Sequence, residues 1–480
     1  MQNLDRKIRN PRVIFRFALA TAMALASIEG SASANPDLTP GIWKNITPAG
    51  INLAGNYGTA FIQMDPGHPE VIYATADMQG LWKTTDAGST WARLGTPPTA
   101  PNYGSTTDYL DSPVQLAIDP ADPQHLYATQ GVRGTTQGFW VSTDGGAHWA
   151  LPAGFLEMST EIGTRDMTSL AVDPSDFKHA LVGSHSGWMG LTNTGILETK
   201  DGGTTWIAHP PVEGFTAATM GVNFLFDPDK HIGNAKTWLI GTDGNGLWRT
   251  EDGGEHFKRV TPVGVWPDFS ISHGGQFTYY STSGVLYAGA FVYPIRSTDN
   301  GLTWTSITSG GAMTYSSYYA IQGDGEQLYT MRSFADNTAK YNASYMVSLE
   351  SDGVNWKAYE GGAQKFDNGP YSMRFDKTNH ILYSANWSAG IWALKVKGPD
   401  GIRSGDAGRF AARRSGDRVR TIVLSGDRLV LLPGMAGRTA ELHDLRGHFL
   451  ARAVVGADGT VALGAQSLIG QVVIVGISTR

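Results

Sequence analysis

The sequence predicts an all-β protein, made of a seven-bladed β-propeller followed by a small C-terminal β-sandwich-like domain. One turn signature recurs about every fifty residues, and similar pairs of short apolar strands precede its copies. A period of this length indicates an array of similar units. Glycine accounts for 60 of the 480 residues, which suits a chain with many tight turns.

The repeated signature, named the Asp box here, reads Ser/Thr-x-Asp-x-Gly-x-x-Trp/Phe. Aspartate accepts backbone N–H groups within a tight turn, glycine supplies a positive φ, and the final aromatic residue packs beneath the hairpin. We therefore expect each box to form the turn between the third and fourth strands of a blade, without a catalytic role. The box aspartates are Asp86, Asp144, Asp201, Asp252, Asp299 and Asp352, and the last box is one residue short.

The first two strands of a blade are joined by a polar turn, as in AFIQMDPGHPEVIYAT at 60–75. A seventh copy at 373–394 has three strands but no box. The segment GIWKNITP at 41–48 resembles a fourth strand, and we expect it to complete the last sheet and close the ring, which removes exposed sheet edges. Because the strands run up and down, the second–third loops and the connections between blades share the end opposite the boxes.

Composition predicts four segments. Residues 1–34 read as a signal peptide, with basic residues before an apolar run at 17–28 and a small-residue cleavage site. The propeller covers 35–396, a linker 397–410, and the small β domain 411–480. We therefore expect a secreted or periplasmic monomer that is not inserted into a membrane. The chain has no cysteine, so neither disulfides nor thiolate chemistry contributes.

Charge divides the chain at the same boundary. Residues 35–394 carry 19 basic and 34 acidic side chains, whereas residues 395–480 carry 13 basic and 7 acidic ones. An acidic propeller argues against nucleic acid as a partner.

The boxes resemble those of the Asp-box, sialidase-type propeller superfamily over residues 41–394. That superfamily includes sialidases, xyloglucan-cleaving hydrolases, polysaccharide lyases, sortilin-type receptors and a photosystem II assembly factor. The segment ATADMQGLW at 74–82 resembles the one that carries a catalytic aspartate in xyloglucanase-like enzymes, which implies a catalytic role for Asp77. In that family two tandem propellers form the cleft, and the second carboxylate lies on the other propeller.

Four functions are compatible with the loops opposite the boxes. Hydrolysis of a glycosidic bond needs two carboxyl groups across that bond. Asp77, Asp108, Asp166 and Asp243 lie on the expected loops and could supply them. This reading, a glycoside hydrolase acting on an extracellular polysaccharide, is the first hypothesis.

A lyase acting on uronic-acid glycans is the second hypothesis. Arginines would neutralise the uronate carboxylate, and His185 or His273 would remove the neighbouring proton. Tyr57, Tyr109 or Tyr315 would then serve as the acid. The arginines expected on these loops are Arg133, Arg165 and Arg332. A sialidase would use the same three arginines to hold a carboxylate, but the Arg-Ile-Pro strand typical of sialidases is missing from the first blade.

A non-catalytic binding ring is the remaining hypothesis. Tyr109, Trp188 and Trp387 could stack on sugars, whichever function holds. No cofactor is required by any of these hypotheses. A structural Ca²⁺ is compatible with the many aspartates, although no EF-hand-like loop is present.

Overall fold

The structure is a computed structural model with two compact units, which divide between Val396 and Lys397. It describes residues 36–55, 58–97, 104–211, 221–227, 232–242, 245–262, 278–333, 340–360 and 364–396 of the first unit, and six strands of the second. The predicted signal peptide at 1–34 and linker at 397–410 lie outside the described residues. Within these described ranges, no helix has the length and apolar character needed to span a membrane.

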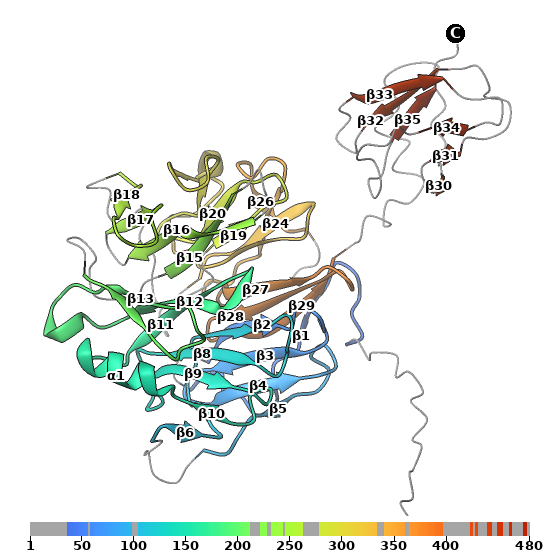
Figure 1. Cartoon of the computed structure of the whole chain (residues 1–480). Helices are drawn as coiled ribbons and strands as arrows, with labels where there is room; N and C mark the ends of the chain where they lie inside the picture. The colour runs from blue at the N-terminus through green and yellow to red at the C-terminus, as the bar shows by residue number, and fades with distance from the viewer. Residues whose placement is uncertain are drawn as a thin grey trace, which may run out of the picture. The chain divides into compact units, whose positions relative to one another are not determined.

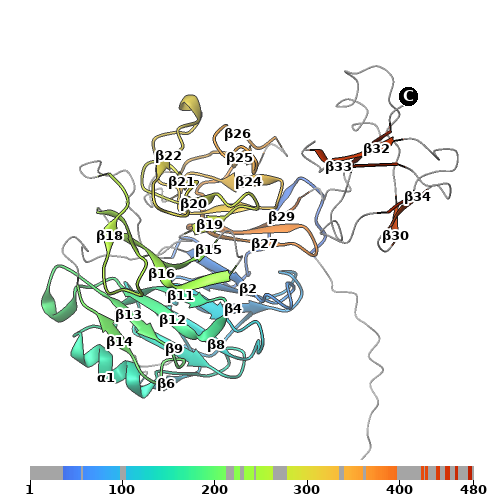
Figure 2. The same ribbon diagram turned by 45° about the horizontal axis from the view of Figure 1, so that its top comes forward.

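The first unit is the predicted seven-bladed propeller, with its sheets arranged around a ring (Figure 1, Figure 2). Blade 1 contains β2 (Thr59–Met64), β3 (Ile72–Ala76), β4 (Gly80–Thr84) and β5 (Ala92–Arg93). Blade 2 contains β6 (Thr106–Thr107), β7 (Gln115–Ile118), β8 (Leu126–Gln130), β9 (Gly138–Ser142) and β10 (Trp149–Ala150). Blade 3 contains β11 (Met167–Asp173), β12 (Asp176–Ser184), β13 (Ile196–Thr199) and β14 (Ile207–His209). Blade 4 contains β15 (Gly221–Asp227), β16 (Ile232–Thr242), β17 (Gly246–Thr250) and β18 (Lys258–Arg259). Blade 5 contains β19 (Thr278–Tyr280), β20 (Leu286–Ala288), β21 (Ile295–Ser297) and β22 (Thr305–Ser306). Blade 6 contains β23 (Ile321–Gly323), β24 (Gln327–Thr330), β25 (Met346–Leu349) and β26 (Lys357–Ala358).

The seventh blade closes the ring as predicted. It contains β27 (Pro370–Asp376), β28 (Ile381–Asn386) and β29 (Gly390–Lys395), and its fourth strand is β1 (Trp43–Asn45) from the start of the propeller. Trp43 pairs with Leu394 and Asn45 pairs with Trp392 in antiparallel register. The closure of the propeller is therefore made by hydrogen bonds between its two chain ends.

The Asp-box turns lie between the third and fourth strands, and their carboxylates are satisfied inside the turn. Asp86 Oδ1 accepts hydrogen bonds from the Thr90 backbone N–H at 2.8 Å and from Thr84 Oγ1 at 2.7 Å. Asp86 Oδ2 accepts a hydrogen bond from Thr90 Oγ1 at 2.6 Å. Burial acts to raise the pKa of Asp86, but these hydrogen bonds outweigh it and hold the pKa below its usual value. These hydrogen bonds stabilise the turn, which accounts for the aspartate of the box.

The core lies between neighbouring sheets, which is why the second strands are buried on both faces. All five residues of β3 and all five of β8 are buried. Two second-strand tyrosines also link their blades to the next ones. Tyr73 Oη donates to the Gly145 carbonyl at 3.0 Å, and Tyr383 Oη donates to the Ala87 carbonyl at 3.3 Å. Each of these tyrosines thus reaches the box turn of the following blade.

Two features depart from the regular four-strand pattern. The short strand β6 makes the second blade five-stranded. The connection from the second to the third blade contains a helix, α1 (Ala153–Glu161), which the sequence analysis does not predict. Phe155 and Ser159 are buried at helical spacing, and Phe155 packs on Trp206 at 5.7 Å between ring centroids. Because the helix has only nine residues and one of its two buried residues is a serine, its apolar periodicity is weak in the sequence.

The second unit is all-β in its described residues. One three-stranded sheet contains β30 (Val423–Ser425), β31 (Arg428–Val430) and β34 (Thr460–Ala462). The other contains β32 (Thr439–His443), β33 (Phe449–Val454) and β35 (Ile474–Ile477).

Candidate active site

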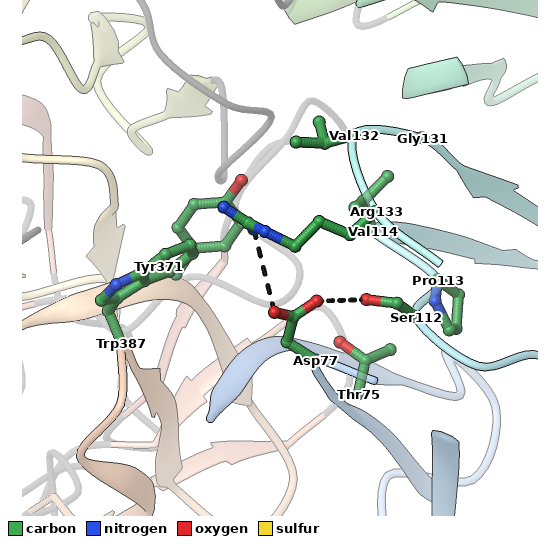
Figure 3. Close-up of a pocket in the computed structure, with 10 residues that line it drawn as sticks. All are labelled: Thr75, Asp77, Ser112, Pro113, Val114, Gly131, Val132, Arg133, Tyr371 and Trp387. Carbon is green, nitrogen blue, oxygen red and sulfur yellow. Dashed lines mark hydrogen bonds and ion pairs between the residues drawn. The ribbon is translucent and has the colours of Figure 1, made fainter. Parts of the chain in front are cut away.

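A recess opposite the box turns collects residues from blades 7, 1 and 2. It is lined by Thr75, Asp77, Ser112, Pro113, Val114, Gly131, Val132, Arg133, Tyr371 and Trp387 (Figure 3). Its enclosed space is about 30 Å³, which is room for roughly one or two water molecules and too little for a sugar ring. A substrate could therefore place only a small group in it.

Asp77 is the only carboxylate among the lining residues. It directly follows β3, and two residues before it lies Thr75, so both side chains point to the same side of the strand. Asp77 Oδ1 accepts a hydrogen bond from Ser112 Oγ at 2.5 Å. Asp77 Oδ2 and Thr75 Oγ1 are buried and have no hydrogen-bond partner in the structure. A buried polar atom without a partner is costly, so these two atoms mark a place for water or a substrate hydroxyl.

Arg133 supplies the positive charge of the recess. Its Nη1 lies 3.8 Å from Asp77 Oδ2, and the guanidinium extends between Asp77 and the Tyr371 ring in Figure 3. The recess therefore holds a carboxylate and a guanidinium side by side.

Two aromatic rings form the wall on the side of blade 7. Tyr371 and Trp387 lie 4.9 Å apart between ring centroids, and both are nearly fully buried. Burial, with a further contribution from Tyr319, raises the pKa of the Tyr371 hydroxyl well above its usual value. Tyr371 therefore remains a neutral phenol that can donate a hydrogen bond but is poorly suited to act as a base.

Asp166 and His185 form a separate pair beside the recess. His185 Nδ1 lies 2.8 Å from Asp166 Oδ2, which also accepts a hydrogen bond from Ser186 Oγ at 2.6 Å. Burial acts to raise the pKa of Asp166, but the hydrogen bonds from His185, Ser186 and the Val132 N–H hold it below its usual value. Asp166 is consequently ionised and cannot donate a proton to a leaving group at neutral pH.

The three arginines that the sequence predicts to act together do not all line the recess. Arg133 lines it, but Arg165 and Arg332 do not. Arg332 Nη2 donates to the Tyr341 carbonyl at 3.0 Å, and its guanidinium lies 4.5 Å from the centre of the Tyr341 ring. Arg332 is thus engaged within the sixth blade.

Stacking of Tyr109 and Trp188 on a sugar is a wrong prediction for this conformation, because both rings are buried, at 3 % and 4 % exposure. Tyr109 packs on Gly80, where an added Cβ would meet its ring. Trp188 donates its indole N–H to Ser184 Oγ at 3.0 Å and belongs to the hydrophobic core. Trp387 does line the recess, although its ring is also buried.

Asp243 lies outside the described residues and stays a prediction. Sequence reasoning missed Thr75, Ser112 and Tyr371. The position of Thr75 two residues before Asp77 could have identified it, whereas Ser112 and Tyr371 reach the recess from distant parts of the chain.

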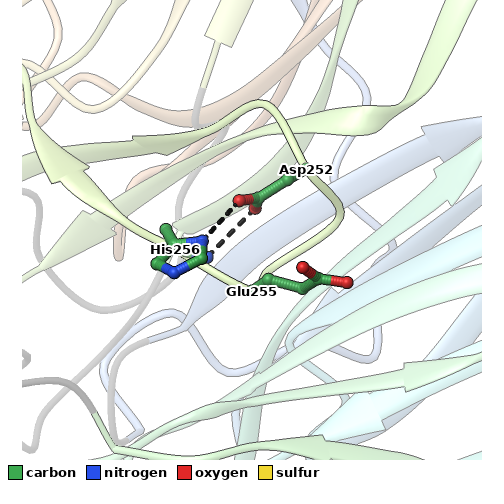
Figure 4. A group of neighbouring side chains, drawn as sticks. All are labelled: Asp252, Glu255 and His256. Atoms are coloured by element: carbon green, nitrogen blue, oxygen red, sulfur yellow. Dashed lines mark hydrogen bonds and ion pairs between the residues drawn. The ribbon is translucent and has the colours of Figure 1, made fainter.

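Among the described residues, one group of three side chains could hold a metal ion. Asp252, Glu255 and His256 lie in the box turn of blade 4 (Figure 4). His256 Nδ1 lies 2.8 Å from Asp252 Oδ2, just as His148 Nδ1 lies 2.6 Å from Asp144 Oδ2 in the second box. In both turns the histidine occupies the position of Thr90, whose hydroxyl bonds Asp86 in the first box. The grouping of these side chains is therefore explained by hydrogen bonding within the turn. The structural Ca²⁺ stays a prediction.

Comparison with known proteins gives similarity to xyloglucanases. The chain is 28 % identical to an oligoxyloglucan-reducing end-specific xyloglucanase of Emericella nidulans over 292 residues, which cover 53 % of this chain and 33 % of that protein. It is 24 % identical to a xyloglucanase of Hypocrea jecorina over 404 residues, covering 74 % of this chain and 46 % of that protein.

Among solved structures, the GH74 enzyme of Niastella koreensis is similar at 17 % identity, with a TM-score of 0.49 and coverage of 89 % of this chain and 68 % of that one. No protein-family model matches the chain. The chain spans less than half the length of the two curated relatives. Its similarity is therefore to propeller glycoside hydrolases of the xyloglucanase type, over part of their length.

Proposed function

We propose that this protein is an exported glycoside hydrolase that cleaves a xyloglucan-like polysaccharide, with Asp77 as its catalytic base. The observation that carries the proposal is the Asp77 carboxylate, which has one buried oxygen without a hydrogen-bond partner in a recess that admits water. The curated relatives are named for xyloglucan cleavage. The ATADMQGLW segment around Asp77 also resembles the segment that carries a catalytic aspartate in xyloglucanase-like enzymes.

The geometry supports the following role for each group. Asp77 Oδ2 and Thr75 Oγ1 would hold a water molecule, and the Asp77 carboxylate would take its proton as the water attacks the anomeric carbon. Such a base works opposite a carboxylic acid that protonates the leaving oxygen, and water between the two gives inversion at that carbon. The acid is not among the residues that line the recess, and Asp243 remains the candidate within this chain.

A polysaccharide lyase is the second candidate. The Asp166–His185 pair favours it, because a carboxylate that orients an imidazole can produce an effective base. Against it, the one guanidinium that lines the recess lies beside Asp77 instead of in an open anion site.

The test is an assay of the purified protein on xyloglucan, on an unsubstituted β-glucan and on a polyuronate. Hydrolysis releases reducing ends alone, whereas elimination also produces an ultraviolet-absorbing unsaturated uronate. We expect reducing ends from xyloglucan and no unsaturated product. No turnover of any of these glycans would contradict the enzyme proposal and favour a binding protein.

Asp77→Asn tests the assignment of the base. Asparagine keeps the acceptor for Ser112 but cannot take a proton, so kcat should fall by roughly 10²- to 10⁴-fold. Asp201→Asn changes a carboxylate of the same type in a box turn and should leave kcat unchanged. Near-normal activity of Asp77→Asn would show that the base is another residue.

A further inference from the structure

We infer that Asp166 is a positioning residue, which holds the turn at 131–133 so that Arg133 is delivered to Asp77. This inference rests on the proposed function. It assigns Asp166 a role different from the direct catalytic role that the sequence predicts.

The turn that carries Arg133 is strained. The Arg133 N–H donates to the Gly131 carbonyl at 2.7 Å across a single residue, Val132, whose φ is +65°. This is a γ-turn with a positive central φ, a rare and strained form. A β-branched residue with positive φ is an outlier that persists only where its surroundings enforce it.

Asp166, from the neighbouring blade, holds Val132 in this conformation. Its Oδ1 accepts the Val132 N–H at 2.5 Å. A Cβ added to Gly131 would collide with the same oxygen, so the carboxylate packs directly against the turn. The hydrogen bonds from His185 and Ser186 fix the other oxygen of Asp166.

A second carboxylate holds the other end of the loop. Asp111 Oδ2 accepts hydrogen bonds from the Thr135 backbone N–H at 2.7 Å and from Thr135 Oγ1 at 2.9 Å. Asp111 Oδ1 accepts a hydrogen bond from Thr136 Oγ1 at 2.7 Å. The loop around Arg133 is therefore fixed at both ends by carboxylates, which preorganises the guanidinium before substrate binds.

The test compares Asp166→Ala with Asp166→Asn on xyloglucan. Alanine removes the acceptor for the Val132 N–H, and kcat should fall by roughly 10- to 100-fold with little change in KM. Asparagine retains an acceptor oxygen and should keep most of the wild-type kcat. If Asp166→Asn is as impaired as Asp166→Ala, the carboxylate has a direct chemical role and the inference is wrong.

Two further variants separate positioning from general destabilisation. Val132→Gly adopts a positive φ without strain, so it should restore much of the kcat when combined with Asp166→Ala. The double variant Asp166→Ala/Arg133→Met should be no slower than Arg133→Met alone, because the two residues act as one unit. Additive losses in the double variant would contradict the inference.

A crystal structure of each Asp166 variant gives a readout that needs no substrate. The Arg133–Asp77 distance of 3.8 Å and the positive φ of Val132 should persist in Asp166→Asn and be lost in Asp166→Ala. An unchanged turn in Asp166→Ala would overturn the positioning role, even if the protein proved to have no hydrolase activity.

Discussion

The two ends of the propeller use aspartate in opposite ways. At the box end, Asp86 receives all its hydrogen bonds from residues within four positions of it. At the recess end, Asp77 accepts a hydrogen bond from Ser112, which lies 35 residues away, and its other oxygen is buried without a hydrogen-bond partner. A carboxylate that its own turn satisfies contributes to stability, whereas one that distant loops hold with spare acceptor capacity is available for chemistry.

Replacing Arg133 tests the recess side of this comparison with the largest expected effect. Arg133→Met removes the guanidinium that lies 3.8 Å from Asp77 Oδ2, and kcat should fall by roughly 10- to 100-fold, because the loss of a positioned group in a site has effects of that order. Arg133→Lys keeps the charge and should lose less. Steady-state kinetics on xyloglucan measure both variants. Equal losses would show that the guanidinium shape matters more than its charge.

Replacing Asp86 tests the box side. Asp86→Ala removes three hydrogen bonds of the turn and should lower the free energy of unfolding by about 1 kcal/mol, since each is partly replaced by water. The kcat on xyloglucan should not change. Denaturant unfolding and kinetics on the same preparation measure the two quantities. A loss of kcat without a loss of stability would contradict the division between the two ends.

A buried network in blade 3 gives the smallest expected effect, through pH. His179 lies between Glu198 at 2.7 Å and Asp173 at 3.2 Å, and His209 lies 3.0 Å from the other oxygen of Glu198. Burial alone would lower the pKa of His179, but these carboxylates raise it above its usual value of 6.5. Burial would likewise raise the pKa of Glu198, but its partners lower it from 4.5 to about 2.

The two pKa shifts determine how the stability of the protein changes with pH. The contribution of His179 to stability is complete below pH 6.5 and is lost as the pH rises through its raised pKa. The contribution of Glu198 is complete above pH 4.5 and is lost as the pH falls towards its lowered pKa. His179→Gln should lower Tm by roughly 1–3 °C near pH 6 and by less near pH 8. His68→Gln changes an exposed histidine and should show no such difference.

The sequence predicted the ring and its orientation because these depend on short segments. An Asp box contains both the aspartate and its hydrogen-bond donors, and the missing seventh box indicated the closing strand. The resemblance around Asp77 also identified the carboxylate that lines the recess.

The remaining features depend on contacts between distant segments. Whether Tyr109 is exposed depends on how its ring meets Gly80, and the role of Asp166 depends on a bond to Val132 across two blades. A loop position alone does not distinguish an aromatic ring that binds substrate from one that fills the core.

The closing strand β1 determines when the two walls of the recess come together. The recess takes Tyr371 and Trp387 from the last blade and Asp77 from the first. Strand β1 joins the last sheet by strand pairing and by the packing of Trp43 on Tyr345 and Phe366. The site consequently cannot exist in a chain that has folded six blades, because its two walls are brought together by the final closure. Formation of the recess therefore depends on completion of the ring, and a molecule that opens at this junction loses the recess while most of its blades remain folded.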